Sequence, residues 1–364
     1  MFSSRVLLIF IFLMHFSCLK SQHTLYLVGD AGEDDKAGKA LLTLKKNIES
    51  DSASTLIFLG DNAYPKGVNT KLLDTFSRPY LHPDAVKLHA QLSILKNYSG
   101  NVFFVSGNHD WKAQKRNNAL RSIMNEQLII DAFISDSTKV RNKNQEESHF
   151  IARKFNDSLF FYSVDLPSQI CLIMFDSQFF LQSMKGVSRR EKTERMEKFA
   201  AQVFTFAKEK SLLGYKIVIA SHHPIYTNGN HSKFRQPLRF LMNYTPFWLL
   251  AKTGIDRWLS QDIEQPLYRE YRAIMMKYLV DFKNVFFVSG HDHNLQYITE
   301  TDDHHIVSGA GSKLKCLRKK ARFKNEFMND QTEGFVKLAF YEKGGVEMQF
   351  VSENNEILFS KVID

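Results

Sequence analysis

Short hydrophobic runs, rich in β-branched and aromatic residues, recur along the chain. Each is followed by a small residue and then by a cluster of Asp, Asn or His, and the runs cover residues 24–28, 55–59, 102–105, 216–220 and 285–288. Runs of this length with polar boundaries are typical of buried strands. The heptapeptide Asn-Val-Phe-Phe-Val-Ser-Gly precedes such a cluster twice, beginning at Asn101 and at Asn284. This repeat favours two sheets that contribute equivalent strands.

Helical periodicity fills much of the sequence between these runs. Apolar residues recur at every third or fourth position in residues 36–48 and 195–213, which predicts helices. Alternating strands and helices imply crossover connections, and ligands of such folds bind beyond the carboxyl ends of the strands. Further strands are predicted at residues 335–341, 346–351 and 357–362. No linker composition interrupts the chain, so we expect an α/β protein with a single domain over residues 22–364.

Composition and charge narrow the range of partners. Of the 364 residues, 44% are hydrophobic and 24% are charged, which is enough apolar material for a large ordered core. The formal net charge is +9, and Lys and Arg are spread along the chain apart from a basic run at residues 313–322. This balance favours anionic substrates or surfaces only weakly. Because the sequence carries no zinc finger or nucleic-acid module signature, we expect no nucleic-acid partner.

The N-terminus predicts export. Arg5 precedes an apolar run at residues 6–14, and a smaller, more polar stretch follows, as in a secretory signal peptide. The apolar run is too short to span a bilayer. Cleavage after Ser21 would remove a signal peptide of residues 1–21 and give a secreted or periplasmic protein. Cleavage before Cys18 would instead leave a lipid-anchored lipoprotein.

The polar clusters after the strands supply the side chains of a metal site. Their candidate ligands are Asp30, Asp61, Tyr64, Asn108, His222, His291 and His293. A hydrolytic site with two metals needs hard oxygen donors, a few imidazoles, one ligand that bridges both ions, and open positions for water and substrate. One cluster alone is a weak signal, because Gly-Asp and Gly-Asn-His also occur in ordinary turns. All of them in order at strand ends indicate a metal centre.

The order of these motifs resembles a known family. Gly-Asp-x-Gly, Gly-Asp-x-x-Tyr, Gly-Asn-His-Asp, a strand ending in His, and Gly-His-x-His together look like the purple acid phosphatases within the calcineurin-like metallophosphoesterases. Residues 59–68 (LGDNAYPKGV) and 290–297 (GHDHNLQY) are similar to the small tartrate-resistant branch, and the likeness covers residues 25–363. The resemblance implies a four-layer αββα sandwich of two mixed sheets flanked by helices. It also implies an acid phosphatase that hydrolyses phosphomonoesters, small or on proteins, through attack by a metal-bound hydroxide.

The resemblance further implies two ions and a division of the ligands between them: Asp30, Tyr64 and His293 for one ion, Asn108, His222 and His291 for the other, and Asp61 as the bridge. Gly32 stands where the wider superfamily usually has a His ligand, while Tyr64 adds a phenolate. Exchange of a neutral nitrogen for a hard anion favours Fe(III) in the first position, with Fe(II), Zn(II) or Mn(II) in the second. The alternative is that Tyr64 is an ordinary loop tyrosine packed beside Pro65.

Two histidines are candidates for proton transfer to the leaving alcohol and for contact with the phosphoryl oxygens. In related enzymes the equivalent of His109 faces the substrate, and the alternative is that it orients a ligand together with Asp110. His231 lies nine residues after His222, where the tartrate-resistant branch has a second active-site His, and the alternative is an exposed loop residue. His223 is expected to support the ligands from behind.

A connection at residues 232–270 is longer than we expect for the small tartrate-resistant enzymes. Its Trp, Phe and Leu residues lie near Arg and Lys, a combination that suits a lid or an interfacial helix in peripheral contact with a membrane. The alternative is a helix packed on the domain.

Other functions remain compatible with the same motifs. A phosphodiesterase or nucleotide hydrolase would use the same dinuclear core. An iron-tyrosinate redox protein would use Tyr64 for peroxide chemistry. An inactive binding module is a further alternative, but it would be expected to have lost a ligand, and all seven candidates are present.

Overall fold

The computed structural model describes residues 23–68, 76–111, 116–152, 161–181, 188–230, 265–342 and 344–364. The expected signal peptide, His231 and most of the expected insert lie outside these residues, so the predictions that concern them stay predictions.

Within the described residues, the first sheet has seven strands in the order β14-β13-β12-β1-β2-β3-β4. Strands β1 to β4 run parallel, whereas β12, β13 and β14 form an antiparallel meander beside β1. The strands are β1 (His23–Val28), β2 (Ser54–Phe58), β3 (Asn101–Val105), β4 (Phe150–Ile151), β12 (Gly334–Tyr341), β13 (Gly344–Ser352) and β14 (Ile357–Ile363). The three strands predicted at the C-terminus are therefore confirmed, as one edge of this sheet.

The second sheet, over the same described part of the chain, has seven strands in the order β11-β9-β10-β8-β7-β6-β5. Strands β6, β7, β8 and β10 are parallel, while β5, β9 and β11 are antiparallel to their neighbours. The strands are β5 (Tyr162–Leu166), β6 (Ile170–Met174), β7 (Lys216–Ala220), β8 (Phe286–Ser289), β9 (Leu295–Ile298), β10 (His304–Ser308) and β11 (Asn325–Asn329). The repeated heptapeptide falls on β3 in one sheet and on β8 in the other, which confirms that the two sheets contribute equivalent strands. Each sheet combines parallel and antiparallel pairs and is therefore mixed.

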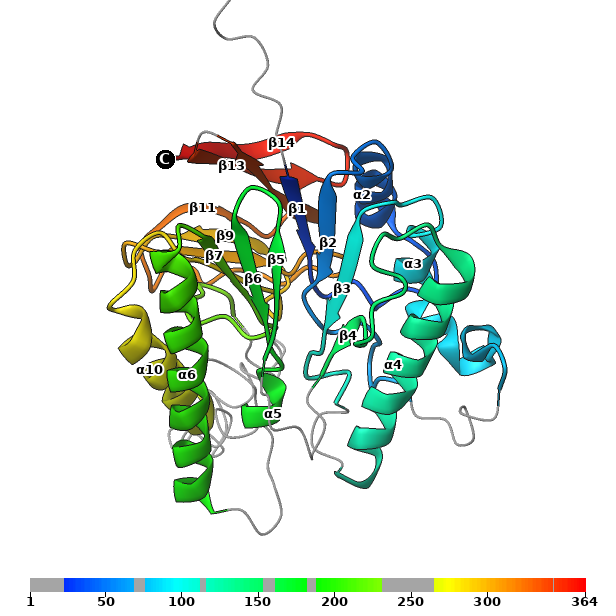
Figure 1. Ribbon diagram of the computed structural model, residues 1–364, viewed down its shortest axis with the longest axis horizontal. Coiled ribbons are helices and arrows are strands. Elements are labelled where there is room, and N and C mark those ends of the chain that lie inside the picture. The colour runs from blue at the N-terminus through cyan, green and yellow to red at the C-terminus, as the bar shows by residue number, and fades with distance from the viewer. Residues whose placement is uncertain are drawn as a thin grey trace, which may run out of the picture.

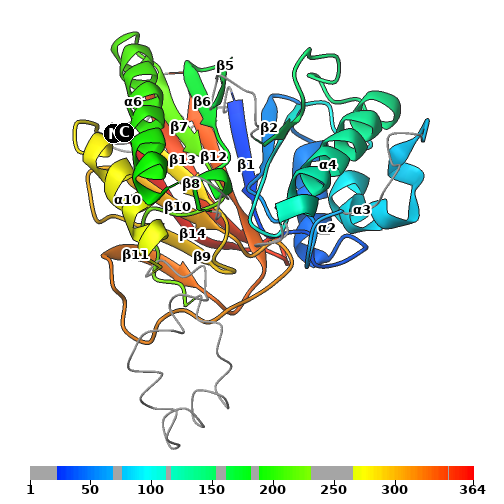
Figure 2. The same cartoon turned by 90° about the horizontal axis from the view of Figure 1, so that it is seen from below.

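Helices cover the outer face of each sheet, so the molecule has four layers (Figures 1 and 2). The first sheet carries α2 (Lys39–Glu49), α3 (Val86–Ser93) and α4 (Arg116–Ser137), with the short 3-10 turns η2 (Pro79–Leu81) and η3 (Pro83–Ala85) near α3. The second carries α5 (Gln178–Leu181), α6 (Arg189–Leu212) and α10 (Pro266–Leu279). The expected αββα arrangement of two mixed sheets flanked by helices is confirmed.

Helix α6 begins earlier than the hydrophobic periodicity predicts. The side chain of Ser188 accepts a hydrogen bond from the backbone N–H of Glu191 at 3.1 Å and caps the helix. Such a cap satisfies one of the unpaired N–H groups of the first turn and contributes about 1 kcal/mol. The cap therefore sets the start of the helix, ahead of Met196, its first fully buried apolar residue.

Alternation along the strands divides the core into two parts. Leu25 and Leu27 of β1 belong to a cluster with Val218 and Val288, which fills the space between the two sheets. Tyr26 and its alternate neighbours on the strand pack in a second cluster, against the helices. Because successive side chains of a strand point to opposite faces, each central strand is apolar throughout. Full burial of one such side chain contributes about 1.5–3 kcal/mol.

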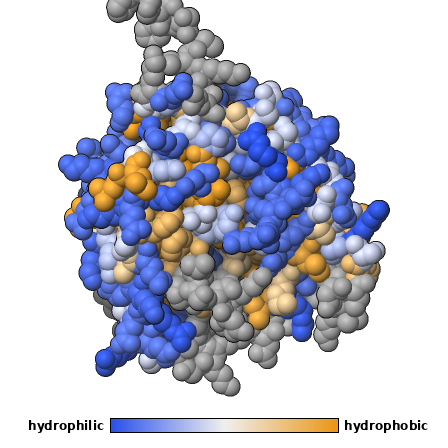
Figure 3. All heavy atoms as spheres, in the orientation of Figure 1, coloured by the Kyte–Doolittle hydropathy of each residue, from blue (hydrophilic) through white to orange (hydrophobic). Residues whose placement is uncertain are grey.

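Most of the surface in Figure 3 is hydrophilic, with hydrophobic side chains in smaller patches. Exposed large apolar residues include Leu212 and Leu213 at the end of α6 and Val280 just after α10. Among the described residues, no helix is both long enough and apolar enough to cross a lipid bilayer.

Candidate metal centre

The polar clusters meet where the central strands of both sheets end. Strands β1, β2 and β3 are neighbours in the first sheet, and β7 and β8 are neighbours in the second. All seven candidate ligands follow these strands and are buried: Asp30, Asp61, Tyr64, Asn108, His222, His291 and His293. The structure therefore brings together every candidate ligand that the sequence indicated.

Three of these residues adopt a left-handed backbone conformation directly after a glycine. Asp30, Asp61 and His291 have φ angles of 57°, 56° and 68°. Such angles are uncommon for residues other than glycine, and local strain of this kind concentrates at functional sites. The turn appears once at the end of each of β1, β2 and β8. It directs three polar side chains into the space between the sheets instead of continuing the strands.

The first group of candidate ligands surrounds the phenol of Tyr64. Its Oη lies 2.8 Å from Asp30 Oδ1, 2.9 Å from Asp61 Oδ2 and 3.2 Å from His293 Nε2. A phenol has one proton and can donate it to only one carboxylate at a time. The remaining oxygen lone pairs converge without enough donors, which fits a cation that prefers hard anionic ligands.

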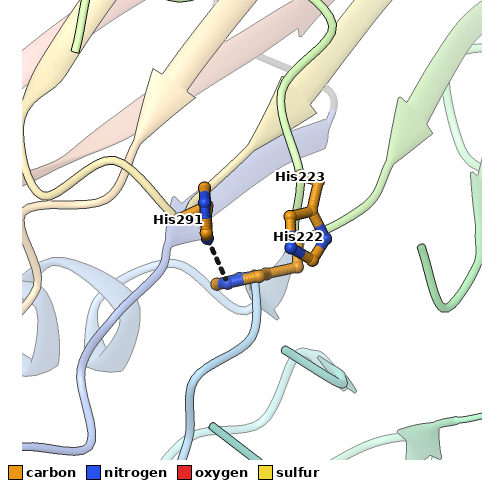
Figure 4. A group of neighbouring side chains, drawn as sticks. All are labelled: His222, His223 and His291. Carbon is orange, nitrogen blue, oxygen red and sulfur yellow. Dashed lines mark hydrogen bonds between the residues drawn. The ribbon is translucent and has the colours of Figure 1, made fainter. Parts of the chain in front are cut away.

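The second group joins an amide oxygen and two imidazoles. Asn108 Oδ1 lies 3.0 Å from both His222 Nε2 and His291 Nδ1, and these two nitrogens are 3.3 Å apart (Figure 4). His222 Nδ1 lies 2.8 Å from the carbonyl oxygen of Leu59 and donates to it, so the lone pair of the neutral ring is on Nε2. Two nitrogens and one oxygen thus converge on one point, as in a site for a divalent ion.

Asp61 connects the two groups. Its Oδ2 faces Tyr64 of the first group at 2.9 Å, while its Oδ1 faces His222 Nε2 of the second at 3.4 Å. The backbone N–H of His109 donates to Oδ1 at 2.8 Å and fixes the orientation of the carboxylate. Asp61 thus has one carboxylate oxygen toward each group and could bind an ion in either or both.

Burial and mutual repulsion determine the protonation of these side chains. Burial raises the pKa of Asp30 to about 8. Burial and the nearby carboxylates of Asp30 and Asp61 hold the pKa of Tyr64 well above its usual value. Burial opposes the charged form of His222, but Asp61 and Asp30 raise its pKa to about 10. The cluster therefore retains protons by itself, and a bound cation would displace them.

Asp110, which the sequence analysis expected to support a ligand, lies behind Asp61. It accepts hydrogen bonds from the backbone N–H groups of Asn62 at 2.7 Å, Ala63 at 3.0 Å and Gly107 at 2.7 Å. The side chain of Asn62 donates to the same carboxylate at 3.0 Å. Asn62 was missed by the sequence analysis, although it directly follows Asp61. Together, Asp110 and Asn62 hold the turn that carries Asp61 in place.

His109 lies at the edge of the site. Its side chain is 29% exposed, its Nε2 lies 3.9 Å from Asp61 Oδ2, and its ring centroid is 4.4 Å from that of Tyr64. Nδ1 lies 2.7 Å from the carbonyl oxygen of Pro65 and donates to it. This hydrogen bond fixes the ring so that Nε2 is the nitrogen nearest the ligands.

His223, which the sequence analysis expected to support the ligands from behind, lies close enough to His222 and His291 to be a ligand itself. His222, His223 and His291 each offer a nitrogen within 4.8 Å of the others. Nδ1 of His223 lies 2.8 Å from the hydroxyl of Ser177, and its ring centroid is 4.5 Å from that of His291. The hydroxyl of Ser177 holds Nδ1 of His223 and so fixes its ring. The fixed ring packs against His291 and thereby orients that candidate ligand.

A basic loop after β10 also reaches the site, and the sequence analysis noted it only as a run of charge. The ammonium of Lys313 lies 4.5 Å from the ring centroid of Tyr64. The backbone N–H of Lys315 donates to the carbonyl oxygen of His293 at 2.8 Å. The signal that could have located this loop is its position directly after a strand that pairs with β8.

Comparison with known proteins agrees with the fold. A profile of the calcineurin-like phosphoesterase family matches residues 23–295. Among curated proteins, none matches the sequence. Several solved structures share the fold at low sequence identity.

Three of these structures show the range of the fold. GAP50, the anchor in the inner membrane complex of Plasmodium, is 18% identical, with a TM-score of 0.51 over 95% of this chain and 89% of that chain. Purple acid phosphatase PPD1 from yellow lupin (Lupinus luteus) is 16% identical, with a TM-score of 0.53 over 95% of this chain and 54% of the lupin chain. A dimetal phosphatase from Danio rerio is 12% identical, with a TM-score of 0.51 over 94% of this chain and 99% of that chain. At these identities the likeness establishes the fold alone.

The match to the family profile covers more than half of the chain, and the strand-end motifs lie within it. The protein belongs to the calcineurin-like phosphoesterase family.

Proposed function

We propose that the protein is a metal-dependent acid phosphatase of the purple acid phosphatase type, which hydrolyses phosphomonoesters at a dinuclear centre. Members of the calcineurin-like family are hydrolases that act on phosphoesters. The observation that carries the finer proposal is Tyr64, whose phenol lies between two buried carboxylates at 2.8 Å and 2.9 Å. An ordinary loop tyrosine would not need to enter the centre of the candidate ligands.

The donor set supports two different ions. Asp30, Tyr64 and His293 would hold the first, with hard anionic oxygens that favour Fe(III). The pKa of Tyr64 is well above its usual value, because of burial and two carboxylates, so only a strongly acidic cation would ionise it. The second group, Asn108, His222 and His291, would offer an amide oxygen and two neutral imidazoles once a bound ion displaces their protons, and this set suits Fe(II), Zn(II) or Mn(II). When bound, the ions would supply charge stabilisation for the phosphoryl group and an acidified water as nucleophile.

The residues around the ligands have separate tasks in this proposal. Asp61 bridges the two groups and keeps them at a fixed separation. His109, at the exposed edge, holds Nε2 toward the site because Nδ1 is bonded to Pro65. In its imidazolium form it would donate the Nε2 proton to the leaving alcohol. Asp110 holds the turn of Asp61 against the strain of its left-handed backbone.

Metal analysis, a visible spectrum and two substrates test the proposal. We expect purified protein to contain iron, to be coloured by charge transfer from Tyr64 to Fe(III), and to release phosphate from nitrophenyl phosphate with an optimum at acid pH. A colourless protein with two zinc or two manganese ions would refute the ferric assignment. Faster turnover of bis-nitrophenyl phosphate would favour a phosphodiesterase, and peroxidase turnover without phosphate release would favour the redox alternative.

Export from the cytoplasm forms part of the same proposal. A secreted or periplasmic location suits an acid phosphatase, and lipid attachment through Cys18 is its variant. Mass determination of the mature N-terminus separates cleavage after Ser21 from cleavage before Cys18.

A further inference from the structure

A buried carboxyl group on α4 lies behind the loop at residues 60–68, which carries two of the candidate ligands. The side chain of Glu126 is fully buried. Its Oε1 accepts hydrogen bonds from the backbone N–H of Val68 at 3.2 Å and from the hydroxyl of Ser122 at 3.3 Å. The side chain of Asn125 donates to the carbonyl oxygen of Val68 at 3.0 Å. Helix α4 therefore holds the end of this loop.

The loop approaches α4 so closely that no further side chain fits between them. Gly67 has a φ of 63°, and a Cβ atom on it would lie 2.6 Å from Oε1 of Glu126 and 2.1 Å from the hydroxyl of Ser122. The backbone N–H of Gly67 also donates to the carbonyl oxygen of Ala63 at 2.8 Å. Glycine suits this position because it tolerates both the left-handed backbone and the close contact. A displaced Glu126 side chain would therefore displace the loop as well.

Glu126 also contacts Asp110, which holds the beginning of the same loop. The two carboxyl groups lie within hydrogen-bonding distance of each other. Two ionised carboxylates in a buried contact repel each other strongly, so such a pair retains a proton. Glu126 thus connects the two anchors of the loop, one at each of its ends.

The hydrogen bonds around the pair indicate which carboxyl carries the proton. Asp110 accepts four hydrogen bonds, from three backbone N–H groups and from the side chain of Asn62, and these favour its ionised form. By contrast, Oε2 of Glu126 accepts no hydrogen bond from the described residues. A protonated carboxyl is a donor, so Oε2–H can donate to Asp110. Burial and the charge of Asp110 raise the pKa of Glu126 well above its usual value, which agrees with this assignment.

These contacts give Glu126 a task at the metal centre. We propose that Glu126 is a positioning residue, which as a neutral acid donates from Oε2 to Asp110 and so keeps the loop at residues 60–68 in the form that presents its two ligands. It acts through Asp110 and the loop, and it touches neither the ions nor the substrate. A neutral partner also adds no negative charge behind the ligands, which would weaken the attraction of the bound ions for phosphate. This inference rests on the proposed dinuclear centre and adds to it the residue that fixes the loop.

Substitutions at two neighbouring positions of α4 test the role. Glu126→Gln keeps an acceptor toward Val68 and a donor toward Asp110, whereas Glu126→Leu keeps the bulk and loses both. Gln127→Leu, at the next and only half-buried position, is the matched control. The Kd of each protein for Zn(II) is measured by competition with a chelator. We expect Glu126→Gln and Gln127→Leu to bind Zn(II) as the wild type does, and Glu126→Leu to bind it about 10–100-fold more weakly.

An infrared spectrum of the metal-free protein tests the proton directly. A neutral Glu126 gives the carbonyl stretching band of a carboxylic acid, which lies above the amide I band and should be absent from Glu126→Gln. Isotope labelling of the glutamate carboxyl carbons shifts this band and leaves the bands of buried aspartic acids, such as Asp30, in place. Loss of packing alone would not remove a band of this kind.

The outcomes separate this inference from the proposed function. The inference is overturned if the wild type lacks the glutamic acid band, or if Glu126→Gln loses as much Zn(II) affinity as Glu126→Leu. An equal loss in Gln127→Leu would also overturn it. If Glu126→Leu does not fold, the infrared band and the Zn(II) affinity of Glu126→Gln still decide the question. A wild type that binds Zn(II) and shows the band, but does not hydrolyse nitrophenyl phosphate when loaded with metal, would refute the phosphatase proposal and support the role of Glu126.

Discussion

Replacement of Tyr64 by Phe removes one hydroxyl and little else. The ring keeps its contact with His109, at a centroid distance of 4.4 Å, and stays beneath the ammonium of Lys313. The hydroxyl is lost from its place between Asp30 Oδ1 at 2.8 Å and Asp61 Oδ2 at 2.9 Å. The change therefore isolates the phenol from the packing of the side chain.

The expected loss of free energy of unfolding follows from the number of protons that Tyr64 can donate. Tyr64 has two carboxylate neighbours but one proton, so the variant loses one hydrogen bond to a charged group at a time, worth about 1.5–3 kcal/mol. We expect metal-free protein to lose about 2 kcal/mol of its free energy of unfolding. With metal, the loss is larger because an anionic ligand is removed from a hard cation, and the visible charge-transfer band should disappear.

Tyr98→Phe is a suitable control. Tyr98 is fully buried, and its hydroxyl contacts the neutral groups of Ser54 at 3.0 Å and Asn101 at 3.1 Å, near the starts of β2 and β3. Its loss should cost about 1 kcal/mol with and without metal, and the colour should be unchanged.

The assay combines urea unfolding, with and without a chelator, with iron content and the visible spectrum. If Tyr64→Phe protein keeps its absorption band and its iron, Tyr64 is not a ligand. The site would then be that of a general metallophosphoesterase. If metal-free Tyr64→Phe loses no more free energy of unfolding than metal-free Tyr98→Phe, the reasoning about the two buried carboxylates is refuted.

Three further predictions concern other parts of the molecule. His109→Gln should lower kcat by about 10²–10⁴-fold for nitrophenyl phosphate while the metal content stays unchanged, and loss of metal in this variant would contradict a role in proton transfer. Asp110→Ala should weaken metal binding by about 10–100-fold, measured by competition with a chelator, because the turn of Asp61 loses its acceptor; equal affinity would refute that role. Burial lowers the pKa of His305 from 6.5 to about 3. The unfolded chain therefore binds the extra proton, and the contribution of His305 to stability, complete above pH 6.5, is lost as the pH falls toward 3. His305→Gln should flatten this part of the stability profile, and an unchanged slope would contradict it.

The sequence predicted the strand ends well because their signal is local. A run of β-branched residues that ends at Gly29, Gly60 or Gly290 specifies both a buried strand and the sharp turn that follows it. The left-handed φ of the residue after each glycine is the physical form of that motif. Parallel strands share one edge of a sheet, so the order of the motifs was enough to bring the candidate ligands together.

The features that the sequence did not reveal depend on contacts between distant segments. The contact of Lys313 with Tyr64 arises because β10 pairs with β8, and no local pattern in the basic run indicates it. The early start of α6 depends on a single hydroxyl, that of Ser188, rather than on hydrophobic periodicity. His231 and residues 231–264 lie outside the described residues, so the second histidine and the membrane-facing insert stay predictions.

Each group of candidate ligands draws on both sheets. The first takes Asp30 and Tyr64 from the ends of β1 and β2, and His293 from the end of β8. The second takes Asn108 from β3, and its two histidines from β7 and β8. Neither half of the sandwich could hold either ion alone. Metal loading would therefore report on folding itself, because a chain that has not joined its two halves correctly would lack both metal and activity.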